Sequence, residues 1–335
     1  MNRECVAIVG SESLIGRELR EVLPKSGLPL TVKLIGIDED AATLTEQDGE
    51  PAIITPLDEE ALRGARIAFL AGSAQSTRRA RGVAANGPAL IDLTYVTEEE
   101  PAARLRAPWL EPPGFEPPPG AVHVIAHPAA IALGLLLDCV SRFSPIRRSL
   151  VLVFEPASER GRRGIGELQK QTVGLLSFKS FPKDVFDAQL AFNMLARYGS
   201  EAPETLEAVE MRIERHLASL LSTSGRSIPL PSLRVVQAPV FHGYSLSVYV
   251  EFEEQPDLSR LAGALASELI DVRDGDLDPP TNVGMAELSG IAVGAIAADR
   301  NDPRACWLWV AVDNLRLMAD NAVETARGLL PAGNR

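Results

Sequence analysis

The feature that most constrains the fold is a short apolar run that ends at a glycine and leads directly into a helical pattern. Residues 5–9 are all apolar and the run stops at Gly10, which is typical of a central parallel strand covered on both faces. Beyond Gly10, apolar residues recur at helical spacing until Pro24 and Gly27 end the pattern. The sequence therefore predicts a strand, a glycine turn and a helix, in that order.

Further apolar runs of similar length follow along the first third of the chain. They occupy residues 32–37, 67–71, 89–93 and 122–126. The repetition of strand, crossover and strand predicts a right-handed, doubly wound α/β domain with a parallel sheet. Residues 108–119 contain six prolines, so we expect an extended surface connector there rather than a helix or an interior strand.

The pattern changes after this connector. Longer strands with some period-two alternation are expected at residues 150–154, 233–239, 244–252 and 291–297. Helices are expected at 205–221, 258–270 and 314–329. These elements predict a second, α+β domain with a mixed or antiparallel sheet. We expect the domains to be 1–130 and 131–312, with a final helix at 313–330 packing back on the first domain.

Composition excludes several classes of protein. The 335 residues are 46% hydrophobic and 23% charged, as in a soluble globular protein, and the net charge of −12 disfavours nucleic acid and anionic membranes as partners. Cys5, Cys139 and Cys306 cannot form an all-paired disulfide framework. The N-terminal apolar run is too short for a signal peptide and residues 129–140 are too short for a membrane span. The sequence predicts a cytoplasmic protein.

The turn after the first strand is a candidate phosphate cradle, because backbone N–H groups and a helix N-terminus meet there. Ser13 occupies the place of a middle glycine and Glu12 adds a negative charge, so any dinucleotide is expected to bind weakly. The preference of any strand-to-helix turn for Gly and Ser explains the same residues equally well. The candidate contacts are Gly10, Ser11, Ser13, Leu14, Ile15 and Gly16.

Asp38 follows the second predicted strand. A carboxylate at that place accepts hydrogen bonds from a ribose diol and repels a 2′-phosphate. The cofactor is therefore expected to be NAD rather than NADP, if a nucleotide binds at all.

Several segments, taken in order, resemble the aspartate-β-semialdehyde dehydrogenase family, which reduces aspartyl phosphate with NADPH through a cysteine thioester. Residues 154–168 are similar to the family stretch Y-Q-A-V-S-G-A-G-x-x-G-x-x-E-L. The other similar segments are the glycine turn, Gly72-Ser73, Phe181-Pro182 with residues 191–193, residues 239–243, and residues 312–316 with 321–323.

The resemblance implies an N-terminal Rossmann-type domain and a C-terminal α+β dimerisation domain of the glyceraldehyde-phosphate-dehydrogenase type. It also implies cofactor contacts at Gly72, Ser73 and Asn314, and a homodimer formed through the sheet of the second domain. The alternation over residues 244–252 and the apolar run 150–154 favour a sheet face that is covered by a second copy of the chain. A sheet face exposed to water is the alternative, because it would accept the serines within residues 244–252 equally well.

The resemblance also identifies where the family's reaction centre falls, and all four positions differ. Ala130 takes the place of the cysteine nucleophile, and Glu155 that of the orienting glutamine. Gln237 and Tyr244 replace the substrate-binding arginine and the acid/base histidine. An alanine cannot form a thioester, and a phenol with a pKa of about 10 transfers protons poorly at neutral pH. The chain most resembles the Usg-type paralogues, which keep the fold and lack the cysteine.

Two hypotheses follow for the function. The first is a non-catalytic family member that binds a small metabolite or a protein partner. The second is an NAD(P)-dependent oxidoreductase acting on an aldehyde or oxo group with altered chemistry, with Tyr244 or His127 as the acid. His127 and His242 without a carboxylate partner do not predict a metal site, and are expected to be partly solvated.

Overall fold

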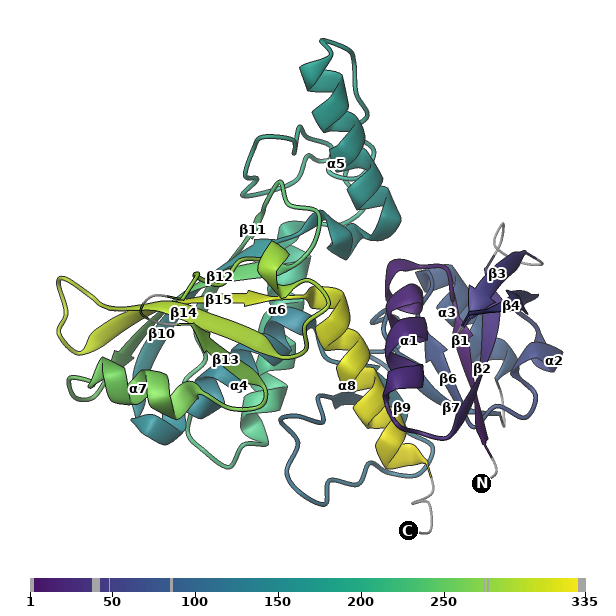
Figure 1. Ribbon diagram of the computed structural model, residues 1–335, viewed down its shortest axis with the longest axis horizontal. Coiled ribbons are helices and arrows are strands. Elements are labelled where there is room, and N and C mark those ends of the chain that lie inside the picture. The colour runs from purple at the N-terminus through teal and green to yellow at the C-terminus, as the bar shows by residue number, and fades with distance from the viewer. Residues whose placement is uncertain are drawn as a thin grey trace. The chain divides into compact units, whose positions relative to one another are not determined.

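The computed structural model describes residues 3–37, 43–47, 49–84, 87–273, 275 and 277–330. The chain divides into two compact units (Figure 1). The first unit comprises the residues up to Ala126 and those from Met318 onward, and the second comprises His127–Leu317. Both predicted architectures, a doubly wound parallel sheet and an α+β unit with a mixed sheet, are confirmed.

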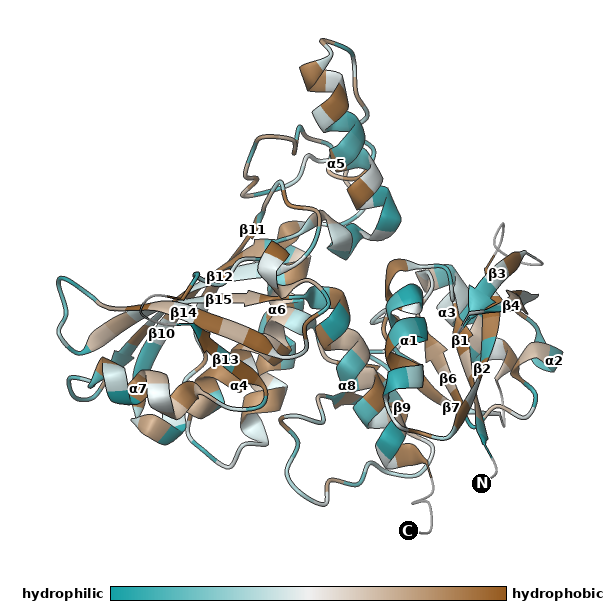
Figure 2. Ribbon diagram, viewed as in Figure 1, coloured by the Kyte–Doolittle hydropathy of each residue, from teal (hydrophilic) through white to brown (hydrophobic). Residues whose placement is uncertain are grey.

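The first unit contains a seven-stranded sheet in which every strand pair is parallel. Its order is β5-β2-β1-β6-β7-β9-β8. The strands are β1 (Glu4–Val9), β2 (Leu30–Gly36), β5 (Thr55–Pro56), β6 (Ile67–Leu70), β7 (Ala89–Asp92), β8 (Ala103–Arg106) and β9 (Val122–Ile125). Residues 108–119 form neither helix nor strand. The interior strands are mostly apolar, as Figure 2 shows for β1, β6 and β7.

Helices and a small hairpin complete the first unit: α1 (Leu14–Lys25), α2 (Glu59–Leu62), α3 (Ala74–Val83), and the pair β3 (Leu44–Gln47) and β4 (Glu50–Ile53). The last helix, α8 (Asn314–Leu329), begins in the second unit and continues into the first. Near its end Arg327 donates a 2.9 Å hydrogen bond to the carbonyl of Ser26, the residue after α1.

Strand β1 lies between β2 and β6. The sheet therefore grows from β1 in one direction through β2 and, later in the sequence, in the opposite direction through β6. The carboxyl ends of β1 and β6 therefore form a topological switch point, where ligands of such sheets bind. Gly10 follows β1 with a φ of 86°. A Cβ on Gly10 would lie 2.4 Å from Cα of Gly72, and one on Gly16 would lie 2.1 Å from the carbonyl oxygen of Gly10. Only glycine permits this close backbone approach.

The second unit contains a six-stranded mixed sheet in the order β11-β10-β12-β15-β14-β13. The β10/β11 and β13/β14 pairs are parallel and the others antiparallel. The strands are β10 (Ile146–Glu155), β11 (Ser232–Gln237), β12 (Tyr244–Phe252), β13 (Ile270–Arg273), β14 (Ile291–Ala298) and β15 (Ala305–Val312).

Helices α4 (Pro128–Phe143), α6 (Leu206–Ser222) and α7 (Leu258–Leu265) lie on one face of this sheet, while α5 (Gly161–Leu176) projects from its edge (Figure 1). Two short 3₁₀ turns, Ala157–Arg160 and Val283–Met285, complete the unit. Among the described residues, no helix is both long and apolar enough to cross a membrane.

Two predictions about the elements of the second unit were incomplete. The helix expected over 258–270 ends at Leu265, and Ile270 begins β13 instead. Strand β15 was not predicted, because its run of apolar residues shows no clear alternation. Its neighbours β12 and β14 cover both of its edges, so it is an interior strand.

The alternation predicted over residues 244–252 is present in β12. Tyr244, Leu246, Val248, Val250 and Phe252 are fully buried on the helix-covered face. The opposite face carries the partly exposed Ser245 and Ser247. The neighbouring strands place large apolar side chains on that outer face, among them Leu150, Leu152 and Trp307, which are 44%, 43% and 39% exposed.

Candidate functional site

The turn at the switch point is held by Ser13, the N-cap of α1. Its Oγ accepts a 2.8 Å hydrogen bond from the backbone N–H of Gly16 and donates a 2.6 Å bond to the carbonyl of Ala71. Helix geometry gives the N–H groups of Leu14 and Ile15 no partner within α1. The turn therefore offers N–H groups at the positive end of the helix dipole, and Ser13 fixes their position.

Ser11 supplies an independent sign of a ligand at this turn. The residue is fully buried, and its Oγ has no hydrogen-bond partner among the described residues. A buried hydroxyl without a partner is unfavourable unless a ligand or water satisfies it. Together with the N–H groups of the first turn of α1, this hydroxyl makes the turn a candidate site for an anion such as a diphosphate.

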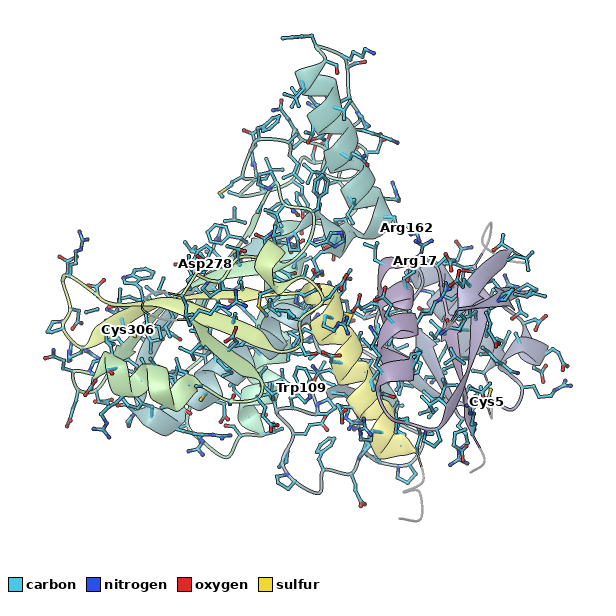
Figure 3. All side chains as sticks on the ribbon, viewed as in Figure 1. Cys5, Arg17, Trp109, Arg162, Asp278 and Cys306 are labelled. Atoms are coloured by element: carbon cyan, nitrogen blue, oxygen red, sulfur yellow. The ribbon has the colours of Figure 1, made fainter. Side chains whose placement is uncertain are left out.

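Glu12 does not act as expected. Its carboxylate pairs with Arg17 at 2.7 Å and with Arg20, both on α1, and Figure 3 labels Arg17 beside this turn. Arg20 also donates to Oε1 of Gln47 at 3.1 Å. The charge of Glu12 is thus compensated on the flank of the helix, and the expected repulsion of an anion loses its basis.

Two other predicted cofactor contacts of the first unit, Gly72 and Ser73, also make contacts within the protein itself. Ser73 caps α3, and its Oγ accepts from the backbone N–H of Ser76 at 3.2 Å within a reciprocal capping box. Gly72 packs against Gly10 as described. Asp38, on which the predicted preference for NAD depends, lies outside the described residues.

In the second unit, the position predicted for the nucleophile is closed. Ala130 lies in the first turn of α4 and is fully buried. His127 caps the same helix, with Nδ1 accepting from the N–H of Ala129 at 3.3 Å. An apolar methyl group therefore stands where the family's chemistry needs a thiolate.

Glu155, at the end of β10, belongs to a buried ion network. Its Oε1 accepts a 2.7 Å hydrogen bond from Arg160, which also contacts Glu204 at 2.8 Å. Glu204 pairs further with Arg212 at 3.1 Å. Burial raises the pKa of Glu155, and the Arg160 guanidinium opposes this effect. The other oxygen, Oε2, is buried without a hydrogen-bond partner among the described residues.

Tyr198 joins Glu155 to Gln237. Its hydroxyl donates to Oε1 of Gln237 at 2.6 Å and lies 3.3 Å from Oε1 of Glu155. Gln237 donates in turn to the carbonyl of Glu155 at 2.8 Å, and the guanidinium of Arg160 lies 5.6 Å from the centre of the Tyr198 ring. Two of the predicted reaction-centre residues, Glu155 and Gln237, are thus brought together and bonded to the protein itself.

His127 forms the other half of this site, and it is buried rather than partly solvated. Its backbone N–H donates to Nδ1 of His216 at 3.0 Å, its Nε2 lies 3.8 Å from Glu159, and its ring lies 6.0 Å from that of Tyr244. Burial, followed by His216 and nearby arginines, lowers the pKa of His127, so its ring is neutral. His242 is exposed.

Glu159 connects His127 to the predicted cofactor contact Asn314. The amide of Asn314 donates to Oε1 of Glu159 at 2.7 Å, and its Oδ1 accepts from the N–H of Gly243 at 3.1 Å. Burial, with a further contribution from Glu155, raises the pKa of Glu159 to about 7. This carboxyl group is therefore able to exchange a proton near neutral pH.

Five residues of this site were not predicted from the sequence: Glu159, Arg160, Tyr198, Glu204 and His216. A signal for two of them was present, since residues 158–161 read Ser-Glu-Arg-Gly where the resembling stretch reads S-G-A-G. Two charged side chains in place of Gly and Ala indicate a changed environment. Tyr198, Glu204 and His216 lie in segments without such a pattern.

The arrangement of the His, Cys, Asp and Glu side chains was compared with what a metal site or a reactive thiol requires. Among the residues that the structure describes, no group of three or more His, Cys, Asp or Glu is placed to hold a metal ion. The cysteines are unpaired, and Figure 3 labels Cys5 in β1 and Cys306 in β15. Burial raises the pKa of Cys306 to about 12, which disfavours a reactive thiolate there.

Comparison with known proteins adds the following relatives. Residues 140–317 match the semialdehyde dehydrogenase dimerisation domain. A USG-1 protein homolog of Pseudomonas aeruginosa is 30% identical over 93% of this chain and 93% of its own. An aspartate-semialdehyde dehydrogenase of Prochlorococcus marinus is 25% identical over 97% of this chain and 95% of its own.

Solved structures show the same architecture. A probable aspartate-semialdehyde dehydrogenase from Pseudomonas aeruginosa superposes with a TM-score of 0.83 at 27% identity, covering 98% of both chains. An aspartate semialdehyde dehydrogenase from Candida albicans, solved with NADP, has a TM-score of 0.68 at 14% identity and covers 98% of this chain and 100% of its own. The latter likeness is one of fold alone.

Proposed function

Because this chain belongs to the aspartate-semialdehyde dehydrogenase family, we propose that it keeps the family's architecture but not its reaction. We infer a binding or regulatory role, with the first unit as a dinucleotide-binding domain and the second as a dimerisation domain. The observation that carries the proposal is Ala130, fully buried where the resemblance puts the cysteine nucleophile.

The family's reaction requires a thiolate that attacks a carbonyl, a group that orients the acyl intermediate and a proton shuttle. Ala130 has no nucleophilic atom. Glu155 is bound by Arg160 and Tyr198, and Gln237 is bound by Tyr198 and backbone carbonyls. Tyr244 is fully buried. The four positions are engaged in holding the second unit together, which supports a loss of the covalent step.

We expect no phosphate-dependent reduction of NADP with aspartate semialdehyde, because no residue can form the thioester. The measurement is NADPH absorbance in a steady-state assay, with an active family member as the positive control. Ala130→Cys alone is not expected to restore turnover, since Glu155, Gln237 and Tyr244 are unchanged. Turnover that copurifies with the wild-type chain and depends on phosphate would refute the proposal.

A dinucleotide is the ligand that the first unit fits best. The chain would hold its diphosphate with the N–H groups of Leu14 and Ile15, the Ser11 hydroxyl and the cradle of Gly10, Gly16 and Gly72. A bound nicotinamide would supply a hydride donor or acceptor. The chain's own contribution at this turn is to orient the diphosphate, and the close packing of the three glycines fixes the backbone that does so.

NAD is expected to bind more tightly than NADP, because the Asp38 carboxylate repels a 2′-phosphate. Isothermal titration of the full chain with each nucleotide measures the preference. Asp38→Ser should reduce the difference, whereas Asp58→Ser, a change of the same type at the N-cap of α2, should leave it unchanged. A preference of the wild type for NADP by even a few-fold would contradict this prediction.

The alternative function is an oxidoreductase that acts on an aldehyde or oxo group without a covalent intermediate. Glu159, with a pKa of about 7 and 3.8 Å from the neutral His127, favours it by offering a proton donor at neutral pH. Oxidation of NADH or NADPH by small aldehydes, lost in Glu159→Gln, would support this function over a purely binding one.

We also propose that the protein is a homodimer formed through the outer face of the second unit's sheet. Leu150, Leu152 and Trp307 expose large apolar surfaces on that face, and such a contiguous patch is typical of an interface. The matching dimerisation domain covers these residues.

Sedimentation equilibrium at micromolar concentration is expected to give the mass of two chains. Leu152→Asp should give one, because it buries an unpaired charge at the centre of the interface. Leu288→Asp is a matched control, since Leu288 is similarly exposed at 46% but lies outside the sheet. A monomeric wild type, or a dimer unaffected by Leu152→Asp, would contradict this arrangement.

A further inference from the structure

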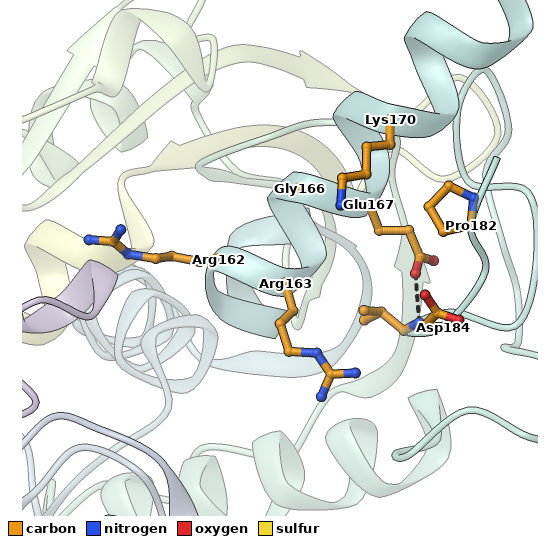
Figure 4. A pocket seen from close by; sticks show the side chains of 8 residues that line it. Arg162, Arg163, Gly166, Glu167, Lys170, Pro182 and Asp184 are labelled. Atoms are coloured by element: carbon orange, nitrogen blue, oxygen red, sulfur yellow. Dashed lines mark hydrogen bonds between the residues drawn. The ribbon is translucent and has the colours of Figure 1, made fainter. Parts of the chain in front are cut away.

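A cavity of about 320 Å³ lies between α5 and the segment that follows it (Figure 4). Its lining includes Arg163, Gly166 and Lys170 from α5, and Asp184 from the facing segment. None of these residues belongs to the ion network around Glu155. The volume is in the range of pockets that hold small ligands.

The wall of this cavity is rigid. The carboxylate of Glu167 accepts hydrogen bonds from the backbone N–H groups of Val185 at 2.7 Å and Phe186 at 3.2 Å. Gln171, one turn further along α5, binds the same segment by accepting from the N–H of Leu190 at 2.7 Å. Both side chains are buried. The cavity is therefore preformed, because buried hydrogen bonds hold both of its sides in place.

The spacing on α5 leaves an opening between two cations. Arg163, Gly166 and Lys170 lie on one face of the helix, three and four residues apart. A Cβ on Gly166 would meet nothing within 4 Å, so the space above this residue is open. Long helical side chains lean toward the N-terminus, and Figure 4 shows Lys170 extending along the helix toward Gly166, whereas Arg163 extends away from Gly166 on the same lining. Lys170 therefore reaches a group placed over Gly166 as it stands, and Arg163, whose side chain is exposed, reaches the same group by a change of rotamer.

The charges of the lining favour an anion. Neither Arg163 nor Lys170 has a hydrogen bond or ion pair with another described residue. Arg162, which also lines the cavity, extends away from Arg163 and Lys170 (Figure 4), and the lining carries two carboxylates, those of Glu167 and Asp184. Glu167 is already bonded to two backbone N–H groups. In a protein with a net charge of −12, two cations without such partners beside one another are a feature that favours an anion.

We propose that this cavity binds a phosphate group over Gly166, between Arg163 and Lys170. Arginine suits a phosphate because its planar fork can donate two parallel hydrogen bonds, and lysine adds a point charge. Asp184 gives the cavity a means to distinguish oxyanions. It can accept a hydrogen bond from the P–OH of hydrogen phosphate or from a hydroxyl group of a phosphate ester, whereas sulfate offers no such donor.

Isothermal titration of the full chain with inorganic phosphate, near neutral pH and about 0.15 M salt, tests the proposal. We expect saturable binding at one site per chain. Arg163→Ala/Lys170→Ala is expected to lower the affinity by at least about tenfold. Gly166→Leu, which fills the opening without changing the charge, is expected to have a similar effect. Lys179→Ala removes a charge from the same segment outside the lining, and should leave binding unchanged.

Two comparisons sharpen the test. Phosphate is expected to bind more tightly than sulfate, and Asp184→Asn should remove that difference. Glycerol 3-phosphate is titrated in parallel. If it binds more tightly than inorganic phosphate, the site takes a phosphorylated metabolite; if inorganic phosphate binds more tightly, the site takes the free ion. Either result supports a phosphate site. Circular dichroism verifies that each variant is folded. Absence of saturable binding, an equal loss in Lys179→Ala, or equal affinity for sulfate and phosphate in the wild type would overturn the proposal.

Discussion

Arg160→Met is expected to lower the free energy of unfolding by about 3–5 kcal/mol, the usual range when one partner of a buried ion pair is removed. Glu155 is fully buried and loses its 2.7 Å contact with the guanidinium. Glu204 is less affected, because it keeps Arg212 at 3.1 Å. Methionine retains most of the aliphatic length, so the loss is mainly electrostatic. Urea denaturation followed by circular dichroism measures it.

The destabilisation in Arg160→Met should depend on pH. The variant loses the cation that opposes the effect of burial, so the pKa of Glu155 in the folded state rises further above its ordinary value of 4.5. At pH values between the pKa of Glu155 in the unfolded chain and its higher pKa in the folded chain, the folded chain binds more protons than the unfolded chain. The free energy of unfolding therefore falls as the pH rises through this range. The deficit relative to wild type should therefore shrink as the pH is lowered toward 4.5.

Two further variants separate charge from packing. Glu155→Gln/Arg160→Met removes both charges, so it should recover much of the lost stability and lose the pH dependence. Arg63→Met breaks an exposed pair with Glu60, in which the side chains are 68% and 72% exposed, and should have little effect. An Arg160→Met deficit no larger than that of Arg63→Met would show that the network contributes nothing.

Gly10→Ala is expected to destabilise the protein by about 4 kcal/mol, because two costs of about 1–3 kcal/mol each combine. One is the φ of 86°, which a residue with a Cβ rarely adopts. The other is the approach of that Cβ to 2.4 Å from Cα of Gly72. The atoms nearest to this Cβ, Cα and N of Gly72, belong to the backbone, so the strain cannot be relieved by a side-chain rotation.

Gly27→Ala is the matched control for Gly10→Ala. Gly27 also has a positive φ, of 72°, but a Cβ there would meet nothing within 4 Å. It should therefore show only the conformational cost, on the order of 1 kcal/mol. Equal losses in the two variants, measured by urea denaturation, would mean that the contact between Gly10 and Gly72 carries no energetic weight.

The sequence predicted what local patterns determine. The apolar run before Gly10 was predicted as a strand because it ends at a glycine and leads into a helical pattern, and the alternation over 244–252 because it separates a buried face from a partly exposed one. The missed strand β15 has neither a glycine boundary nor a clear alternation.

The candidate site was less predictable, because its contacts join distant segments. Arg160 meets Glu204 and the ring of Tyr198, both from loops far along the chain, and no local pattern specifies that encounter. Glu12 shows that the direction of a side chain can also be hard to predict when its partners are near in the sequence. The sequence located its charge beside the phosphate cradle, but the side-chain direction was decided by pairing with Arg17 and Arg20.

The division of the chain has a consequence for how the protein is made. The first unit consists of residues up to Ala126 and from Met318 onward, so the second unit is an insertion within it. During synthesis the N-terminal sheet emerges first but lacks α8, which returns to it through contacts such as Arg327 with Ser26. The second unit, which is continuous, can complete its core earlier. The first unit, although its sheet is translated before the second unit, can thus finish folding only after α8 has been translated.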